Sequence, residues 1–453
     1  MKMARLFGTD GARGVAITEI TCELAMQIGR AAALVLTKHL SHKAKIFVGK
    51  DTRISSDILE AALVAGICSV GADAVVLGVI PTPAVATLVR KEKADAGVMI
   101  SASHNSVEFN GIKLFAGNGY KLSDEIEEEI EALILDTPEI IEQNLKSGTE
   151  IGRICRHRTA HRDYVDYVKN TIAGDLSGIR VVVDCAHGSA SATAEKLFTE
   201  LGARVFLINA TPDGTNINER CGSTHIDALS KIVKENNCHL GIAFDGDADR
   251  CLAVDENGVI VDGDKIIAIF AKAMNEDGML RNHTAVVTVM SNLGFRKFTK
   301  ENDINMEVTK VGDRYVLERM LEGGFNLGGE QSGHIILLDE ATTGDGQLSA
   351  VKLLSILKKS GKKMSELAGV MERYPQVLMN VKIAPEWKNK IDKEGDIQRV
   401  IAKFQEGLGE DGRILVRESG TEPLVRVMVE GKNFEAINNI AVEITDMIRK
   451  RMA

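Results

Sequence analysis

The 453-residue sequence predicts an α/β fold in which three related α/β domains with mixed, mostly parallel sheets precede a C-terminal α+β domain. Up to about residue 360, short aliphatic runs alternate with longer amphipathic stretches, which is typical of βαβ units and parallel sheets. Beyond residue 364, the order of strands and helices is typical of a small domain with an antiparallel sheet. A chain of this length also exceeds what one hydrophobic core sustains, so we expect several domains.

The first domain, residues 1–152, opens with a glycine-rich segment at 7–14 that carries Arg13. Ser55 or Ser56 is the expected N-cap of the second helix, because a side-chain hydroxyl accepts hydrogen bonds from the free N–H groups of a first turn. Strands are expected at 45–49, 73–77 and 94–100, and helices at 21–40, 55–71, from Pro81 onward, and at 123–135. The polar segment 136–152 is interpreted as a connection between domains.

The second domain, residues 153–256, and the third, residues 257–363, are expected to repeat this architecture. Glu-Leu-Gly-Ala at 200–203 precedes a strand and a Thr-Pro pair, as Ser-Val-Gly-Ala does at 69–72. Strands are expected at 180–184, 204–208, 239–244, 284–289, 306–310 and 335–338. Helices are expected at 163–170, 189–202, 227–236, 264–274, 313–322 and 345–359. The basic segment 153–162, with His157 and His161, is interpreted as a surface strand in preference to a phosphate contact.

The C-terminal domain, residues 364–453, is expected to contain strands at 377–383, 413–417 and 424–430. Its expected helices are at 394–407 and 434–452.

Charge and cysteine usage exclude several classes of protein. The net charge is −9, which argues against a surface that coats nucleic acid. The 7 cysteines are scattered singly, as in proteins of a reducing compartment. No apolar run approaches the roughly 20 residues needed to span a bilayer, and the N-terminus is too short and polar for a signal peptide. We therefore expect a cytoplasmic protein that binds neither nucleic acid nor a membrane.

The stretch Ser101-Ala102-Ser103-His104-Asn105 leaves the end of the predicted buried strand 94–100. Open α/β sheets place their chemistry at the carboxyl ends of strands, so either serine is a candidate reactive group. The competing interpretation is an ordinary turn, because Ser and Asn are common turn residues.

Asp245, Asp247 and Asp249 follow another predicted buried strand, and together they can enclose one hard cation. An EF-hand is the structural competitor because Glu256 occupies its twelfth position. Its sixth position requires glycine and here holds Arg250, and the flanking segments are predicted strands. Three carboxylates this close repel one another, which favours a bound divalent ion, and a phosphate oxygen is a suitable further ligand for Mg²⁺.

Two more polar loops are candidates for ligand binding. Residues 328–334 combine glycines with Glu330, Ser332 and His334, which can hydrogen-bond sugar hydroxyls or carry a proton. Residues 417–423, with Arg426, combine two guanidiniums, two hydroxyls and a glycine, a combination typical of a phosphate cradle.

Taken in order, these four loops resemble the motifs of the α-D-phosphohexomutase superfamily over essentially the whole chain. Within the superfamily, residues 7–14, residues 309–316 and Gln331 resemble the branch that acts on glucosamine phosphates. The resemblance implies four domains around a central cleft and an isomerase that interconverts glucosamine 6-phosphate and glucosamine 1-phosphate. It also implies a phosphoserine enzyme, a hexose 1,6-bisphosphate primer and intermediate, and a role in supplying UDP-N-acetylglucosamine and cell-wall precursors.

The resemblance assigns roles to individual residues. The phosphoserine would be Ser103, because the family's phosphoserine directly precedes His-Asn, and Mg²⁺ would be bound by an oxygen on Ser103 with Asp245, Asp247 and Asp249. The transfer site would be lined by Arg13, His104, Lys113 and Arg250. The sugar hydroxyls would contact Glu330 and Ser332. The non-reacting phosphate would contact Arg417, Ser419, Gly420, Thr421 and Arg426. Either Lys113 or His334 would move the hydroxyl proton.

The resemblance also implies a homodimer and an activating phosphoryl donor or kinase for Ser103. Two positions depart from the family pattern, since Ser106 and Glu418 stand where proline is usual. Both changes remove a fixed φ, so we expect altered loop rigidity without loss of activity. The alternatives are a phosphomannomutase or phosphoglucomutase, a metal-dependent sugar phosphatase, and a sugar-phosphate binding protein without catalysis.

Overall fold

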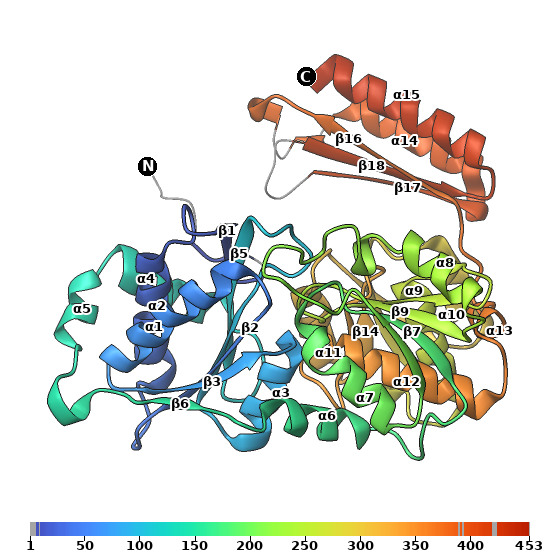
Figure 1. The fold of residues 1–453 in the computed structure, drawn as a ribbon. Helices are drawn as coiled ribbons and strands as arrows, with labels where there is room; N and C mark the ends of the chain where they lie inside the picture. The colour runs from blue at the N-terminus through green and yellow to red at the C-terminus, as the bar shows by residue number, and fades with distance from the viewer. Residues whose placement is uncertain (1–5, 9, 388–389, 392–393, 419–423, 453) are drawn as a thin grey trace. The chain divides into compact units, whose positions relative to one another are not determined.

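The computed structural model describes residues 6–8, 10–387, 390–391, 394–418 and 424–452. The chain divides into two compact units (Figure 1). One comprises Met1–Met290 with Ile304–Val370, and the other comprises Ser291–Asp303 with Met371–Ala453. The larger unit contains three of the four sheets.

The first sheet has the strand order β1-β5-β4-β2-β3-β6. Its strands are β1 (Ala12–Val15), β2 (Lys45–Lys50), β3 (Asp73–Val79), β4 (Ala96–Ile100), β5 (Phe109–Ala116) and β6 (Ile154–Arg156). The strands β2, β3, β4 and β6 are parallel, whereas β5 runs antiparallel to β4 and to β1. The sequence did not predict β5. Because β5 returns beside β4, residues 101–108 form a connection at the carboxyl end of β4.

Helices cover both faces of this sheet. The helices α1 (Cys22–Thr37), α2 (Ile54–Ser69) and α4 (Asp124–Leu135) share one hydrophobic core with the sheet, and α3 (Thr82–Glu92) packs on the opposite face (Figure 1). Gly66 lets α1 and α2 touch, since a Cβ there would lie 2.2 Å from the Met26 carbonyl oxygen. The short helix α5 (Pro138–Gln143) interrupts the segment predicted to be a connection.

The predicted N-cap of α2 is wrong. The helix begins one residue earlier, with Arg53 at the N-cap position and no side-chain cap. Ser55 and Ser56 lie inside the helix, where both hydroxyls accept hydrogen bonds from the Asn110 side chain. Tertiary contacts within the first domain therefore use the hydroxyls that local capping was expected to use.

The second sheet has the order β11-β10-β9-β7-β8. Its strands are β7 (Arg180–Asp184), β8 (Arg204–Ile208), β9 (Leu240–Phe244), β10 (Cys251–Asp255) and β11 (Ile260–Val261), and its helices are α6 (Ala160–Lys169), α7 (Ala194–Glu200) and α8 (Asp227–Glu235). The helix predicted at 189–202 is divided, since a 3₁₀ turn at Ser189–Ala192 precedes α7.

The third sheet has the order β13-β12-β14-β15. Its strands are β12 (Thr284–Thr288), β13 (Asn305–Thr309), β14 (Leu327–Gly329) and β15 (Ile335–Leu337). Its helices are α9 (Gly263–Glu276), α11 (Asp313–Gly323), α12 (Gly346–Ser360) and α13 (Met364–Ala368). The hairpin of β14 and β15 carries the loop with Glu330, Ser332 and His334.

The smaller unit has an antiparallel sheet of order β16-β18-β17, covered by α14 and α15 (Figure 1). These elements are β16 (Gln376–Lys382), β17 (Gly412–Glu418), β18 (Leu424–Gly431), α14 (Gly395–Leu408) and α15 (Phe434–Met452). The helix α10 (Leu293–Glu301), which the sequence did not predict, belongs to this unit. Asn292 holds it there, because its amide donates to the Tyr374 carbonyl and to the Glu430 side chain, each at 3.0 Å.

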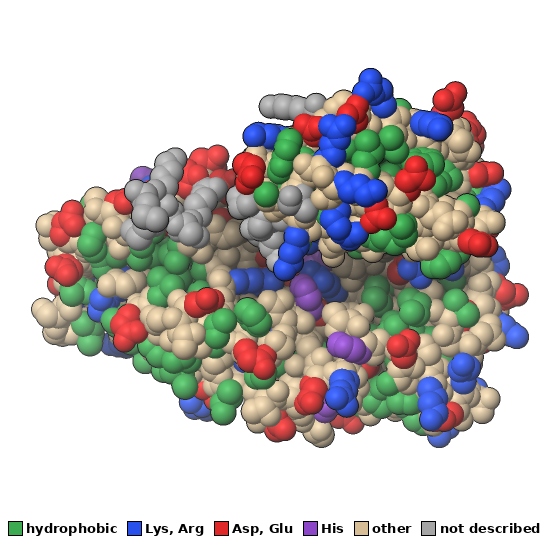
Figure 2. Space-filling model, turned by 90° about the horizontal axis from the view of Figure 1, so that it is seen from above, with side chains coloured by type: hydrophobic (Ala, Val, Ile, Leu, Met, Phe, Trp, Pro, Cys, Tyr) green, Lys and Arg blue, Asp and Glu red, His purple; other side chains and the backbone are tan. Residues whose placement is uncertain are grey.

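The predicted fold class is confirmed, with mixed, mostly parallel sheets followed by an antiparallel α+β arrangement. On the face shown in Figure 2, acidic and basic side chains are interspersed. Among the described residues, no helix has both the length and the apolar character needed to cross a membrane. The predicted boundaries at 152/153, 256/257 and 363/364 stay predictions.

Candidate active site

Ser103 lies just beyond β4 in a left-handed backbone conformation, with φ of 52°. Its side chain is buried, and its hydroxyl donates to Asp245 Oδ2 at 2.6 Å. The hydroxyl of Ser101, in contrast, donates to Asp51 Oδ2 at 2.7 Å and accepts from the Ser103 N–H at 2.9 Å. Of the two candidate serines, Ser103 is therefore the one that faces the aspartate cluster.

The aspartate cluster occupies the turn between the antiparallel strands β9 and β10. Asp245, Asp247 and Asp249 are all buried, and one oxygen of each lies within 4.8 Å of the others. Gly246 allows the turn to approach the serine loop, because a Cβ there would lie 2.6 Å from the Ser103 carbonyl oxygen. The close approach places three carboxylates and one hydroxyl around a single point.

This group of oxygens fits a divalent cation. Among the described residues, the buried Oδ1 atoms of Asp247 and Asp249 have no hydrogen-bond partner, which is costly for carboxylates unless a cation binds there. Burial, and then the charges of Asp249 and Asp247, raises the pKa of Asp245 well above its usual range. An all-oxygen donor set of this kind is suited to a hard ion such as Mg²⁺.

Lys113, on β5, adds a buried positive charge to the same site. Its Nζ lies 2.8 Å from Asp247 Oδ2, 3.2 Å from Asp10 Oδ2 and 3.5 Å from Asp249 Oδ2. Burial alone would lower the pKa of Lys113, but the charges of the three carboxylates outweigh it and raise that pKa. The Thr82 hydroxyl, at the start of α3, donates to Asp247 Oδ2 at 2.6 Å.

A second group of charges extends from Lys113, and the sequence did not predict it. Lys121 Nζ lies 2.5 Å from both Asp10 Oδ1 and Asp313 Oδ2, and Asp10 also pairs with Arg13. Burial would raise the pKa of Asp10, but Lys113, Lys121 and Arg13 hold it well below its usual value. Asp10 and Asp313 lie within the segments 7–14 and 309–316, which resemble family motifs, whereas nothing in the sequence distinguishes Lys121.

His104 and Arg250 lie beside Ser103. The Nδ1 atom of His104 is 3.4 Å from the Ser103 hydroxyl, and the backbone N–H of Arg250 donates to Asp245 Oδ1 at 3.2 Å. Burial, followed by the charges of Arg250 and Arg13, lowers the pKa of His104 to about 4. The structure thus brings the four predicted transfer-site residues to one end of the first two sheets. These residues are Arg13, His104, Lys113 and Arg250.

The third-domain loop meets this site through His334. Its Nδ1 lies 3.6 Å from Asp249 Oδ2, and its Nε2 accepts from the Gly344 N–H at 3.1 Å. Both imidazole nitrogens are therefore engaged. The Glu330 carboxylate accepts from the Gly312 N–H at 3.1 Å, and the buried Ser332 hydroxyl has no hydrogen-bond partner within the part of the chain that the structure describes.

The two arginines of the predicted phosphate cradle lie in the smaller unit. Arg417 on β17 and Arg426 on β18 are directly opposite each other in the antiparallel ladder. Burial and the neighbouring Arg426 charge lower the pKa of Arg417. The Glu418 carboxylate accepts from the Ile391 N–H at 3.0 Å. Ser419, Gly420 and Thr421 lie outside the described residues.

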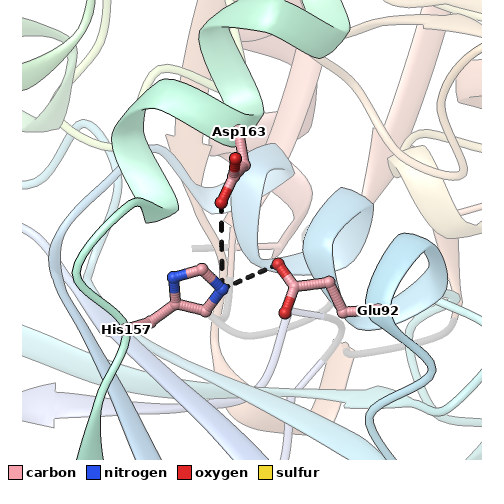
Figure 3. Close-up of side chains that lie close together, drawn as sticks. All are labelled: Glu92, His157 and Asp163. Atoms are coloured by element: carbon pink, nitrogen blue, oxygen red, sulfur yellow. Dashed lines mark hydrogen bonds and ion pairs between the residues drawn. The ribbon is translucent and has the colours of Figure 1, made fainter.

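Glu92, His157 and Asp163 form a separate, half-buried group of metal-ligand type in the larger unit (Figure 3). The His157 Nε2 atom lies 2.7 Å from Glu92 Oε1 and 4.0 Å from Asp163 Oδ2, while the Thr159 hydroxyl donates to Asp163. These contacts link the three side chains into one group that joins α3 to α6. The interpretation of this segment as surface structure agrees with that arrangement.

Comparisons with known proteins agree with the arrangement of fold and site. Four family models match in succession. They describe phosphoglucomutase/phosphomannomutase α/β/α domain I at residues 4–140, domain II at 162–258, domain III at 262–374 and the C-terminal domain at 378–447. The chain therefore belongs to the phosphoglucomutase/phosphomannomutase family.

The curated relatives define the activity within that family. A phosphoglucosamine mutase of Thermoanaerobacter sp. (strain X514) is 55% identical over 450 residues, covering 99% of this chain and 100% of the relative. One of Clostridium perfringens (strain SM101 / Type A) is 55% identical over 449 residues, with the same coverage. The protein is an isomerase with phosphoglucosamine mutase activity, which interconverts glucosamine 6-phosphate and glucosamine 1-phosphate.

Solved structures share the fold at low sequence identity. A phosphoglucomutase/phosphomannomutase family protein from Burkholderia thailandensis is 22% identical with a TM-score of 0.79, covering 98% of this chain and 97% of that one. An Aspergillus fumigatus N-acetylphosphoglucosamine mutase, in complex with GlcNAc-6P and magnesium, is 17% identical with a TM-score of 0.70 and covers 99% and 96%.

Proposed function

We propose that the isomerisation proceeds by two phosphoryl transfers through Ser103. Phospho-Ser103 gives its phosphoryl group to the C1 hydroxyl of glucosamine 6-phosphate, and glucosamine 1,6-bisphosphate forms. After reorienting, this intermediate returns its 6-phosphoryl group to Ser103, and glucosamine 1-phosphate leaves. The observation that carries the proposal is the 2.6 Å contact between the Ser103 hydroxyl and Asp245, at the edge of a buried carboxylate cluster.

Mg²⁺ is the cation that we assign to this cluster, held by Asp245, Asp247, Asp249 and an oxygen on Ser103. The two carboxylate oxygens that accept no hydrogen bond from the described residues support the assignment, as does the magnesium named with the A. fumigatus relative. When bound, the ion would neutralise charge that develops on the transferring phosphoryl group.

The remaining charged residues would stabilise the same group. Lys113 is assigned to charge stabilisation, because its ammonium lies among three carboxylates. Arg13 and Arg250 would contact the phosphoryl oxygens, and His104 would contact Ser103. His334 is assigned to orienting Asp249, because its second nitrogen is occupied by the Gly344 N–H.

Substrate recognition is assigned to two further loops. Glu330 and the Ser332 hydroxyl, which forms no hydrogen bond with the described residues, would bind sugar hydroxyls. Arg417 and Arg426, with Ser419, Gly420 and Thr421, would bind the phosphate that is not reacting. Two opposed arginines on neighbouring strands suit a dianionic group, because each guanidinium can donate two parallel hydrogen bonds to it.

The proposal also includes the priming of the enzyme, its cellular location, the use of its product and its assembly. A hexose 1,6-bisphosphate would prime the enzyme, or another phosphoryl donor or kinase would phosphorylate Ser103 first. We place the reaction in the cytoplasm, where the scattered cysteines, all of them free in the structure, would remain reduced. The product would supply UDP-N-acetylglucosamine and cell-wall precursors, and the working assembly would be a homodimer.

Replacing Ser103 by alanine tests the proposal, with Ser106→Ala as the control because Ser106 is exposed and lies in the same loop. We expect S103A to lose isomer formation and the phosphorylated species in intact mass spectra, and S106A to keep both. The substrates should be glucosamine, glucose and mannose phosphates side by side, with inorganic phosphate measured in each reaction. Full isomerase activity in S103A would overturn the proposal, and release of phosphate in place of an isomer would favour the phosphatase alternative.

A further inference from the structure

One buried guanidinium contacts three backbone carbonyls of the Ser103 loop. The side chain of Arg53 is 1% exposed, and its Nη2 donates to the Ser103 carbonyl at 3.1 Å and to the Asn105 carbonyl at 2.7 Å. Its Nη1 donates to the Ser106 carbonyl. A planar fork with fixed donor directions can satisfy several acceptors at once only when they are held in one arrangement. The contacts therefore define the backbone path of residues 103–106.

Asp51, which is also buried, orients this arginine. Its Oδ2 accepts from Arg53 Nε at 2.9 Å and from the Ser101 hydroxyl at 2.7 Å. The same Ser101 hydroxyl accepts from the Ser103 N–H at 2.9 Å. Asp51 itself is fixed to the sheet, since its N–H donates to the Ile100 carbonyl at 3.0 Å. Asp51 and Arg53 together thus hold both backbone polar groups of Ser103. Arg53 binds the carbonyl directly, and Asp51 binds the Ser101 hydroxyl that accepts from the N–H.

These contacts hold Ser103 in a strained backbone conformation. Ser103 has a positive φ, a conformation that costs a non-glycine residue about 1 kcal/mol or more and persists only when its surroundings enforce it. The resemblance predicts a looser loop here, because Ser106 replaces the usual proline. The guanidinium instead holds the Ser106 carbonyl directly. On the other side, the Asn218 amide donates to the carbonyls of Ser103 and Asn105, both at 2.9 Å.

We propose that Arg53, oriented by Asp51, is a positioning residue for phosphoryl transfer. It holds the 103–106 backbone so that the oxygen of Ser103 points at Asp245 and the proposed metal site. Without the guanidinium, the loop would relax from its left-handed conformation. The phosphoryl group on Ser103 would then turn away from its ligands and become more open to attack by water. The inference rests on the proposed phosphoserine.

The test compares Arg53→Met and Arg53→Lys with the control Arg90→Met. Arg90 is half-buried, and it donates to the Tyr167 hydroxyl at 2.8 Å and to the Glu340 carbonyl, away from the Ser103 loop. Each variant is primed with glucose 1,6-bisphosphate. The phosphoserine half-life is followed by intact mass spectrometry. The values of kcat and KM are measured at a temperature that lies the same number of degrees below each variant's Tm.

For R53M we expect kcat to fall about tenfold or more with KM changed less than about threefold, and the phosphoserine half-life to shorten several-fold. R53K, which keeps the charge and loses the fork, should fall between R53M and wild type. R90M should lower Tm while keeping wild-type kcat and half-life. If R53M does not fold, Ser101→Ala removes the two hydrogen bonds of the Ser101 hydroxyl, with Asp51 and with the Ser103 N–H, and leaves the guanidinium in place, so it should shift kcat and half-life in the same direction by less.

Two outcomes would overturn the inference. One is an R53M variant whose kcat and phosphoserine half-life match those of R90M. The other is full recovery in R53K, which would show that charge alone is needed. A wild-type enzyme that never acquires the phosphoryl group would instead refute the proposed function, so the two failures are distinguishable.

Discussion

Replacing Lys113 by methionine should make the stability of the protein strongly dependent on a divalent cation. The side chain is 1% exposed, and its ammonium lies within 3.5 Å of Asp10, Asp247 and Asp249. Methionine fills a similar volume without the charge. Asp10 keeps Lys121 as a partner, so the uncompensated charge falls mainly on Asp247 and Asp249.

Removing one partner of a buried ion pair typically costs about 3–5 kcal/mol. For a unit of this size, that loss corresponds to a fall in Tm of roughly 5–10 °C in the presence of EDTA. Millimolar Mg²⁺ should recover more of the Tm in K113M than it adds to wild type, because the cation relieves a repulsion that wild type does not have.

The assay is thermal unfolding with EDTA and with Mg²⁺, and Lys50→Met is the matched control. Lys50 also pairs with two carboxylates, those of Asp57 and Glu60, but one of them, Asp57, is largely exposed. An exposed pair contributes about 1 kcal/mol or less, so K50M should lose less Tm and show the wild-type response to Mg²⁺. Equal Mg²⁺ shifts in K113M and wild type would refute the assignment of these aspartates to a cation site.

Three more predictions concern stability. Burial raises the pKa of Asp345 to about 6, so the folded protein keeps a proton that the unfolded chain releases above about pH 4. The stability of wild type relative to Asp345→Asn should therefore be greatest below pH 4 and decrease by about 3 kcal/mol by pH 7, as measured by unfolding at several pH values. Asparagine can still accept the hydrogen bond from Tyr164, and parallel pH profiles would contradict the prediction. Gly66→Ala should cost about 3 kcal/mol or more, because the new methyl group would meet the Met26 carbonyl, and calorimetry should show this as a lower Tm. Gly407→Ala, in open space within α14, should instead gain about 0.5–1 kcal/mol, and a loss of stability there would contradict the reasoning.

The sequence alone determined the fold class, most helices and strands, and the family. These features depend on signals that repeat locally, namely the period of apolar residues, and on four ordered motifs that lie in the loops. It also determined which residues to consider at the site. The structure brings Ser103, Lys113 and the three aspartates together, although their roles stay proposals.

The elements that the sequence did not predict depend on distant partners. The strand β5 contains glycine and a lysine, and its core face includes Lys113, which is buried because carboxylates from the second domain surround it. The helix α10 is held in its unit by Asn292, which contacts residues 82 and 138 positions away. Ser55 and Ser56 have the pattern of a cap, yet Asn110 takes their hydroxyls.

Only the tertiary structure decided how the charges of the site are balanced. Lys121 joins Asp10 and Asp313 across separations of 111 and 192 residues, and Arg53 reaches carbonyls about 50 residues away. A buried charge is stable only where opposite charges and hydrogen-bond acceptors surround it, and those neighbours come from different sheets. Periodicity and motifs report what a residue does within its own segment, whereas the partner of a buried charge is fixed by how the segments pack.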